Sequence, residues 1–470
     1  MQKTLVMKFG GTSVGSVDAL KSATQIIRDA KKDWDRVVVV TSAMSGVTNL
    51  LLDSAASASQ GTVDLLSETE STLREKHFSA ADALIKDETL REETKIEIAA
   101  LIRSLVNLCK AIAVLGEASL RALDAVASLG ERMSVRLLEA VAADAGIMVE
   151  GIESNEFVVT NEHFQHAHPD FKATTEKTRA LFNPLMDKGI IPITTGFIGA
   201  TPEGVITTLG RGGSDYSAAI IASVLPADDV WIWTDVDGVM TSDPRIVKEA
   251  KTLPEISYGE IAELAYYGAK VLHPKTIRPV VEAGIGLRIC NTFNPSHPGT
   301  RLKANGSNSK ANGHVIKAVT AIRDQKLVTI EGRGMLGVPG VAARAFGAVA
   351  STGTSVPLIT QASSEQSICF AIPTESSKQV LDALQKNFAI EINERDIDRV
   401  WATEEVAIIT AVGTGTRNTP GVAGQIFSKL GVNNINVLAI AHGSSDFSIS
   451  MVIETKDTEV AVKALHELIV

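Results

Sequence analysis

Apolar residues in the N-terminal part of the chain fall into two kinds of segment. Short apolar runs lie at residues 5–9, 36–41, 189–195 and 229–235, and the run at 36–41 is almost entirely β-branched. Such runs are typical of strands buried on both faces of a parallel sheet. Residues 62–145 instead carry apolar side chains three and four positions apart, as one face of a helix does. This alternation predicts an α/β fold with a mainly parallel central sheet.

The pattern changes after residue 293. Residues 294–314 are rich in Pro, Ser, Asn, Gly and Lys and have no periodicity, which predicts a linker. Beyond it lies an internal repeat, because a series of positions from Gly332 to Ile368 aligns without gaps onto positions from Gly413 to Ile449.

Each copy of the repeat predicts a strand, a glycine loop, a helix and two further strands. In the first copy these are strands 328–331, 355–361 and 367–372, with a helix at 341–350. The order is that of a ferredoxin-like unit.

A further strand candidate, residues 315–322, has no partner in the first copy, so we expect it to pair with the second and the first copy to be an insertion. The predicted layout is a first domain at 1–293, a linker at 294–314, one ferredoxin-like domain at 323–395, and another formed by 315–322 plus 396–470.

Composition narrows the class of protein. The 470 residues are 45% hydrophobic, enough for more than one core, and the net charge of −10 argues against a general nucleic-acid binder. The three cysteines, Cys109, Cys290 and Cys369, are too scattered for a disulfide framework or a zinc site. With no signal-like N-terminus and no run of about eighteen apolar residues, we expect a cytoplasmic protein.

Candidate chemistry begins at the first turn, where strand 5–9 runs into Gly10 and Gly11 ahead of a helical segment. Glycines and the free N–H groups of a helix N-terminus suit a phosphate. Lys8, directly before the turn, supplies a positive charge for an oxygen that becomes more negative during transfer. An ordinary strand-to-helix turn with a solvated lysine is the alternative, and no P-loop motif is present.

A second group of polar residues suits an amino acid. Arg211 stands among three glycines in a loop that continues into Ser214 and Asp215. The Arg211 guanidinium can bind a carboxylate through two hydrogen bonds, and Asp215 can take an ammonium group, so together they suit the α-carboxylate and α-amino groups of an amino acid. Capping of the next helix by Ser214 or Asp215 is the alternative.

Other polar residues stand at ends of elements or in loops. Ser42 and Thr48 follow strand 36–41, where capping of the next helix is the simpler role, and Glu131 adjoins a glycine that interrupts the helical pattern.

The loop 234–245 lacks the glutamate of a calcium loop and fits a nucleotide's ribose and base edge, with Lys270 as a second basic group. The histidines of residues 163–168 lack the partners of a metal site, and we expect them at the surface.

Five strings in this order resemble the aspartate kinases of the amino-acid kinase superfamily: KFGGTSV at 8–14, GERMS at 130–134, LGRGGSD at 209–215, WTDVDGV at 233–239 and GAKVLHP at 268–274. The paired repeats resemble the two ACT regulatory domains of that family. The resemblance covers essentially the whole chain. It implies a three-layer amino-acid-kinase fold followed by two βαββαβ ACT domains, and ATP-dependent, Mg²⁺-assisted phosphorylation of the L-aspartate side-chain carboxylate in the biosynthesis of lysine, threonine and methionine.

The resemblance also implies roles for residues. Lys8 and Asp215 would be catalytic, and aspartate would be held by Ser42, Thr48, Glu131, Arg211, Ser214 and Asp215. The nucleotide would contact Lys8, Gly10, Gly11, Thr234, Asp235, Met240, Arg245 and Lys270. Met240 departs from the family, in which many members have tyrosine. The ligands of Mg²⁺ stay open, and a homodimer or higher oligomer through the ACT domains is implied.

The same resemblance indicates a regulator. Lysine-regulated relatives carry an acid where this chain has Pro357, and threonine-regulated relatives have a glutamine at the place of Gln361. Proline offers no charge to a lysine ammonium, whereas the Gln361 amide can both donate and accept. We expect feedback inhibition by threonine at a site that includes Met335, Gly337, Val356, Pro357 and Gln361, although packing between strands would also account for Pro357 and Gln361.

Two other functions compete with this interpretation. One is an amino-acid kinase with another acceptor, such as acetylglutamate, against which Arg211 with Asp215 favours a free amino acid. The other is a non-catalytic amino-acid sensor, against which Lys8 and the glycine loops argue. We expect no homoserine dehydrogenase domain.

Overall fold

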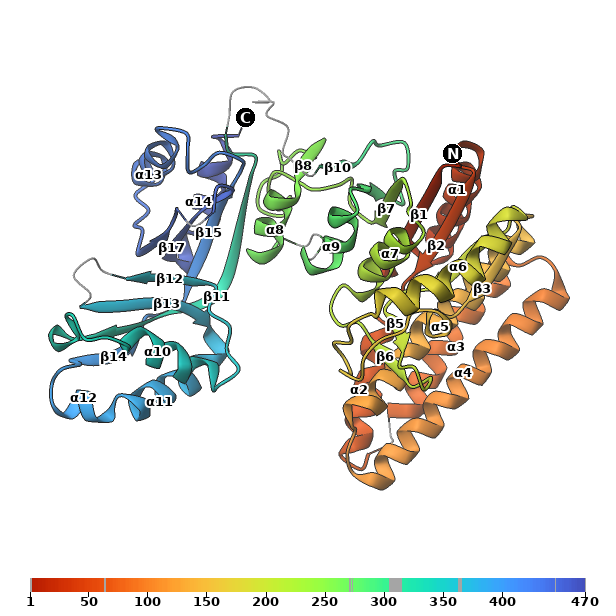
Figure 1. Cartoon of the computed structure of the whole chain (residues 1–470), viewed down its shortest axis with the longest axis horizontal. Helices are drawn as coiled ribbons and strands as arrows, with labels where there is room; N and C mark the ends of the chain where they lie inside the picture. The colour runs from red at the N-terminus through yellow and green to blue at the C-terminus, as the bar shows by residue number, and fades with distance from the viewer. Residues whose placement is uncertain are drawn as a thin grey trace. The chain divides into compact units, whose positions relative to one another are not determined.

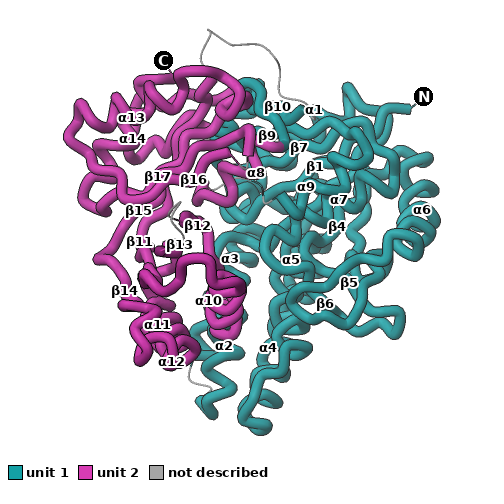
Figure 2. The backbone as a smooth tube through the Cα atoms, turned by 60° about the vertical axis from the view of Figure 1, so that its left-hand side comes forward, with its two compact units in different colours: residues 1–239, 254–258, 272–305 teal, residues 240–253, 259–271, 306–470 magenta. Residues whose placement is uncertain are grey.

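The computed structural model describes residues 2–62, 65–269, 272, 274–303, 315–361, 366–443 and 445–469. It divides into two compact units (Figure 2): residues 1–239, 254–258 and 272–305 form the first, and residues 240–253, 259–271 and 306–470 form the second. The segments 240–253 and 259–271, expected in the first domain, therefore cluster with the C-terminal part of the chain.

The first unit is built on an eight-stranded sheet. Every neighbouring pair is parallel except β9 with β10, so the predicted mainly parallel sheet is confirmed. In spatial order the strands are β3 (Val149–Ile152), β4 (Ile191–Thr195), β2 (Arg36–Thr41), β1 (Thr4–Phe9), β7 (Asp229–Thr234), β9 (Gly286–Asn291), β10 (Thr300–Lys303) and β8 (Glu255–Ser257). A separate hairpin pairs β5 (Ile198–Ala200) with β6 (Ile206–Thr208).

Helices surround this sheet, some packed on its strands and others on neighbouring helices (Figure 1). Each of them buries one apolar side. The largest core cluster joins β1 and β2 to helices from α1 to α5. The helices are α1 (Val17–Asp33), α2 (Val47–Ser59), α3 (Leu65–Leu84), α4 (Glu88–Leu115), α5 (Leu120–Asp144), α6 (Phe171–Asp187), α7 (Gly213–Val224) and α9 (Pro274–Glu282).

Helix α4 is, among the described helices, the one long and apolar enough to cross a membrane by length and composition. Its apolar face nevertheless packs into the core of the first unit, through Ile98, Ile102, Leu105, Cys109 and Ile112. The buried face is what a core helix of a globular domain shows.

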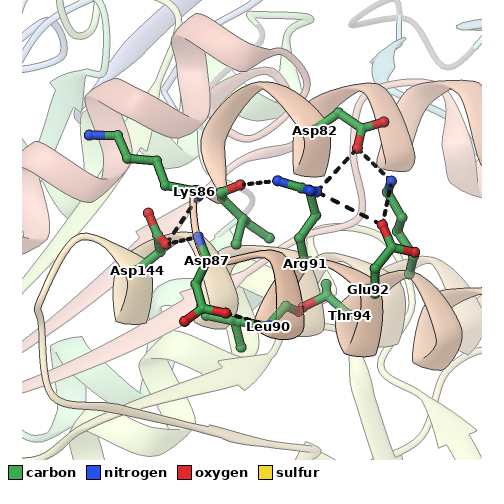
Figure 3. Close-up of polar contacts among 10 residues, drawn as sticks. Asp82, Lys86, Asp87, Leu90, Arg91, Glu92, Thr94 and Asp144 are labelled. Atoms are coloured by element: carbon green, nitrogen blue, oxygen red, sulfur yellow. Dashed lines mark hydrogen bonds and ion pairs between the residues drawn. The ribbon is translucent and has the colours of Figure 1, made fainter.

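Polar contacts fix the turn between α3 and α4 (Figure 3). The Asp87 side chain caps α4 by accepting from the Leu90 N–H at 2.9 Å, and Asp144 accepts from the N–H groups of Lys86 and Asp87 at 3.1 and 2.9 Å. Lys95 of α4 reaches Asp82 of α3 at 2.5 Å. These contacts hold two long helices antiparallel at the edge of the unit.

Two expectations for the first unit are wrong. Gly130 does not interrupt the helices, because α5 runs through it from Leu120 to Asp144. A Cβ atom at Gly130 would lie 2.8 Å from Ala43 Cβ, so the glycine permits a close approach between α5 and the loop after β2. The expected linker contains the strand β10, in which Thr300 and Leu302 are buried and Arg301 and Lys303 exposed.

The second unit holds a seven-stranded sheet in which one long strand serves both repeats. Residues Ala318–Ile322 of β11 (Ala318–Glu331) pair with β15, and residues 325–331 pair with β13. The predicted pairing of 315–322 with the second repeat is therefore present. The strands are β12 (Leu358–Gln361), β13 (Ser367–Pro373), β14 (Arg399–Ala402), β15 (Val406–Val412), β16 (Ala439–Ala441) and β17 (Ser448–Glu454).

The helices of the second unit agree with the repeat, and α10 (Val341–Ala350) has the predicted bounds. The others are α8 (Tyr258–Tyr266), whose first residue falls in the first unit, α11 (Ser377–Asn387), α12 (Ala389–Asn393), α13 (Val422–Val432) and α14 (Thr458–His466).

Two boundaries in the second unit differ from expectation. The strand expected at 355–361 begins only at Leu358, directly after Pro357, which has no N–H to give to a ladder. Strand β14 pairs with Val328–Glu331 of β11 in the first repeat. We therefore propose that the first ferredoxin-like domain extends beyond residue 395 and includes β14.

Candidate active site

The first turn of the chain is a tight glycine turn at the carboxyl end of β1. The Gly10 N–H donates to the Trp233 carbonyl at 3.0 Å, and the Ser45 N–H donates to the Gly11 carbonyl at 3.1 Å. A Cβ atom at Gly11 would lie 2.9 Å from the Ala43 oxygen. Glycine is therefore required for the close packing of this turn against the loop after β2.

A cavity of about 600 Å³ opens beside this turn in the first unit. Its lining contains the predicted catalytic pair and every residue predicted to hold the amino acid: Lys8, Ser42, Thr48, Glu131, Arg211, Ser214 and Asp215. Gly11 also lines it. The structure thus brings together side chains from β1, α2, α5 and α7 and from the loops that precede α2 and α7.

Lys8 and Asp215 form an ion pair in this cavity. Lys8 Nζ lies 2.7 Å from Asp215 Oδ1, and the two side chains are 12% and 17% exposed. Lys8 comes from β1 and Asp215 from the first turn of α7. The pair places a cation next to the glycine turn, where a transferred phosphoryl group would need one.

Glu131 is the most deeply buried acid predicted to hold the substrate, at 4% exposure. Burial raises the pKa of its carboxyl to about 8, against the lowering effects of hydrogen bonds and of the nearby Lys8 charge. Among the described residues its Oε2 has no hydrogen-bond partner. A buried carboxyl with an unused oxygen is suited to receive an ammonium group from a ligand.

Arg211 lies in an exposed loop between two glycines with left-handed backbone, Gly210 at φ 80° and Gly212 at φ 69°. No ion pair to its guanidinium is found in the described part of the chain. Its charge is therefore available to a carboxylate ligand, and the glycines permit the turn that carries it.

The cavity wall also contains residues that sequence reasoning did not select. They include Asp124, Gln165, His166, Phe197 and Thr208. The histidines of residues 163–168 are exposed as expected, yet His166 lines the cavity. An acid seven positions before Glu131, on the same face of a helix, was the one signal that could have pointed to Asp124.

The predicted nucleotide residues divide between the two units. Thr234 and Asp235 stand at the end of β7, with the Thr234 hydroxyl 3.1 Å from Asp235 Oδ1. In the second unit, Met240 Sδ lies 3.4 Å from the Thr252 hydroxyl, and Arg245 binds Asp243 through Nε at 3.0 Å. Lys270 lies outside the described residues.

The predicted effector residues belong to the first repeat. Met335 is 4% exposed and packs in its core, whereas Gly337 has a left-handed backbone with φ 69°. Val356 and Pro357 are half-buried ahead of β12, and Gln361 is exposed at the end of that strand.

Comparison with protein families gives two matches. Residues 3–291 match the amino acid kinase family, and residues 328–388 and 409–468 match an ACT domain. The two ACT matches fall on the two copies of the internal repeat.

Comparison with individual proteins gives relatives that match almost the whole of this chain. A carrot (Daucus carota) bifunctional aspartokinase/homoserine dehydrogenase is 37% identical over 98% of this chain and 50% of its own. This chain thus spans about half the length of such bifunctional relatives. The lysine-sensitive aspartokinase 3 of Escherichia coli is 34% identical over 99% of both chains.

Comparison with solved structures also gives aspartokinases. The crystal structure of E. coli aspartokinase III in complex with aspartate and ADP superposes with a TM-score of 0.80, at 32% identity and over 99% of both chains. The E. coli relative matches over the full length at more than 30% identity, and the family match covers most of the chain, including the cavity described above. This chain therefore belongs to the aspartokinase family of amino acid kinases.

Proposed function

We propose that this protein is an aspartate kinase, which uses ATP to phosphorylate the side-chain carboxylate of L-aspartate. The observation that carries the proposal is the cavity in which the Lys8–Asp215 pair, Glu131 and Arg211 converge beside a glycine turn. The E. coli structure in complex with aspartate and ADP supports it.

The chemistry requires little beyond positioning and charge neutralisation. A carboxylate oxygen of aspartate attacks the γ-phosphorus, the new O–P bond forms, and the bond to the ADP oxygen breaks. The carboxylate is already anionic, so no general base has to remove a proton. Lys8 stabilises the charge that spreads over the phosphoryl oxygens, and the backbone of Gly11 lies at the same turn. The Gly10 N–H already donates to the Trp233 carbonyl, so Gly10 would serve by permitting the turn.

Two residues give the cavity its preference for an amino acid. Arg211 would bind the α-carboxylate, and Glu131 would receive the α-ammonium group, because Asp215, for which that role was expected, pairs with Lys8. Ser42, Thr48, Ser214 and Asp215 line the same space and would orient the side chain that is phosphorylated. The nucleotide side is proposed to use Thr234, Asp235, Met240, Arg245 and Lys270.

We propose that Mg²⁺ arrives with ATP. Among the described residues no three acidic, histidine or cysteine side chains converge as a metal site. Magnesium commonly binds one or two carboxylates together with phosphate oxygens and water. When bound, it would neutralise charge on the phosphates, and Asp215 is the carboxylate that lies beside Lys8.

The second unit is proposed to bind a regulatory amino acid, threonine, near Met335, Gly337, Val356, Pro357 and Gln361, in a homodimer or higher oligomer formed through the ACT repeats. A bound effector changes activity only if it binds two conformations unequally, so we propose a two-state equilibrium that threonine biases.

A coupled assay of ADP release tests the function and its alternatives. Aspartate should support ADP release and acetylglutamate should not, and threonine should inhibit more strongly than lysine. ADP release with acetylglutamate alone would indicate a different acceptor. No release with either acceptor, combined with amino-acid binding, would indicate a sensor.

A further inference from the structure

Asp124 is a buried carboxylate that the chemistry above does not use. It lies on α5, two helical turns before Glu131, and is 1% exposed. Residues seven positions apart on a helix share a face. The face of α5 that presents Glu131 to the cavity therefore also presents Asp124, and both side chains line the cavity.

Hydrogen-bond donors from two distant segments surround the Asp124 carboxylate. Thr208 donates its hydroxyl to Oδ1 at 2.8 Å and its N–H to Oδ2 at 2.9 Å. The Gln165 N–H donates to Oδ2 at 2.9 Å and to Oδ1 at 3.1 Å. One carboxylate thus connects α5 to the end of β6 and to the segment that contains His166.

One of the connected segments continues into the loop that carries Arg211, and the other packs against that loop. The loop starts directly after Thr208, and the Ala167 N–H donates to the Thr208 carbonyl at 2.9 Å. A Cβ atom at Gly210 would lie 2.7 Å from His166 Nδ1 and 2.8 Å from the Gln165 carbonyl oxygen. The backbone just before Arg211 is therefore packed against a segment that Asp124 holds.

We propose that Asp124 is a positioning residue for substrate recognition, which fixes the base of the Arg211 loop and so sets the affinity for the substrate's α-carboxylate. The inference rests on the proposed function, because it assigns Arg211 to that carboxylate. The role is distinct from catalysis, since Asp124 acts on the substrate through Thr208, Gln165 and the loop that follows Thr208.

The carboxylate is needed because its hydrogen-bond partners, the Thr208 hydroxyl and the N–H groups of Thr208 and Gln165, all donate to it. An ionised carboxylate only accepts, whereas an asparagine amide of the same shape presents two N–H donors on one side. In Asp124→Asn the side-chain NH₂ group would therefore face the N–H group of Thr208 or of Gln165. The hydrogen bonds on that side would be lost. Burial raises the pKa of the Asp124 carboxyl, and the hydrogen bonds from Gln165 and Thr208 offset part of that rise.

The test is the aspartate KM of Asp124→Asn in the full-length protein. We expect it to rise about tenfold, since small misplacements of a positioning group have large effects, with the ATP KM unchanged. In an Arg211→Ala background the same substitution should add almost nothing, because the two residues act through one contact. Asp33→Asn, an exposed acid at the end of α1, is the matched control.

A second pair of variants, at Thr208, tests the same hydrogen bond without changing Asp124, so the proposal stays testable if Asp124→Asn does not fold. Thr208→Val removes the hydroxyl that donates to Asp124 and should raise the aspartate KM clearly more than Thr208→Ser, which retains it. Calorimetric titration of aspartate reports the same ranking without turnover. Circular dichroism checks that each variant is folded.

The outcomes separate the two proposals. An active wild type together with an unchanged aspartate KM in Asp124→Asn, or equal effects of the two Thr208 variants, overturns the positioning role alone. Equal rises in the aspartate and ATP KM values also overturn it, because they indicate a general structural defect. A wild type that neither binds nor phosphorylates aspartate overturns both the role and the proposed function.

Discussion

Lys8 Nζ lies 2.7 Å from Asp215 Oδ1, although β1 and α7, which carry the two residues, are distant elements in the sequence. Both side chains are mostly buried, so each charge depends on the other for compensation. In the absence of phosphate, Asp215 therefore holds the lysine at the glycine turn. A nucleotide phosphate would compete for the same ammonium group.

Removal of the lysine should affect the chemical step. Lys8→Ala is expected to lower kcat by about 10²-fold or more, because it removes a charge that matters most in the transition state. Steady-state kinetics with both substrates measures the change. Lys32→Ala, an exposed lysine on α1, is the control and should behave as wild type. A Lys8→Ala enzyme with normal kcat would contradict the catalytic assignment.

Removal of the arginine should affect binding instead. Arg211→Ala is expected to raise the aspartate KM strongly with a smaller change in kcat, because the guanidinium would bind a carboxylate that does not react. Arg211→Lys should recover only part of the loss, since an ammonium group cannot form the same two parallel hydrogen bonds. An unchanged aspartate KM in Arg211→Ala would show that this loop does not hold the substrate.

Much of the fold could be predicted from the sequence because the patterns that indicate its strands and helices lie within single short segments. The β-branched run at Arg36–Thr41 coincides with β2, and the helix Val341–Ala350 coincides with α10. Most of the predicted cavity residues stand at ends of strands and helices, where glycines and hydroxyl groups mark them, whereas Glu131 lies within α5.

The features that sequence reasoning missed depend on contacts between distant segments. Gly130 resembles a helix break in the sequence because its neighbours Ala43 and Leu51 come from other elements. Strand β10 is four residues long, and its place in the sheet comes from pairing with β9 and β8. Asp124 meets Thr208 and Gln165 only in the folded chain.

Burial raises the pKa of Glu131 to about 8, so we expect aspartate binding through this carboxyl to depend on pH. Below pH 8 the carboxyl is mostly protonated and cannot pair with an ammonium group, so binding must release its proton. We expect aspartate affinity to increase as pH rises from about 6.5 to about 8, with release of nearly one proton at about pH 7. Calorimetry in buffers of different ionisation enthalpy measures that proton.

Glu131→Gln provides the comparison for this pH dependence. It should bind aspartate more weakly than wild type at the alkaline end of that range, and the proton release near neutral pH should disappear with the titrating carboxyl. Proton release that persists in Glu131→Gln would assign it to another group.

Two glycines in helices should respond oppositely to alanine. Gly130→Ala places a methyl group 2.8 Å from Ala43 Cβ, so we expect a loss of about 1–3 kcal/mol from overpacking. Gly347 lies in α10, where an added Cβ atom would meet nothing within 4 Å, so Gly347→Ala should be neutral or stabilising by about 0.4–1 kcal/mol. Differential scanning calorimetry of both variants checks this, and equal destabilisation would refute the packing role of Gly130.

The regulator of this chain should differ from that of the E. coli relative named as lysine-sensitive. Pro357 precedes β12 without a charge, and the exposed Gln361 ends that strand, so the first repeat offers an amide rather than an acid to an effector side chain. A lysine ammonium that binding buried there without an anionic partner would be strongly disfavoured, whereas a threonine hydroxyl can bond the amide. We therefore expect calorimetry to show threonine binding more tightly than lysine to wild type, and threonine binding to be lost in Gln361→Ala. Exposed Gln25 on α1 gives the matched control, Gln25→Ala, which should keep threonine binding. Tighter binding of lysine than of threonine by the wild type would refute the inference from Pro357.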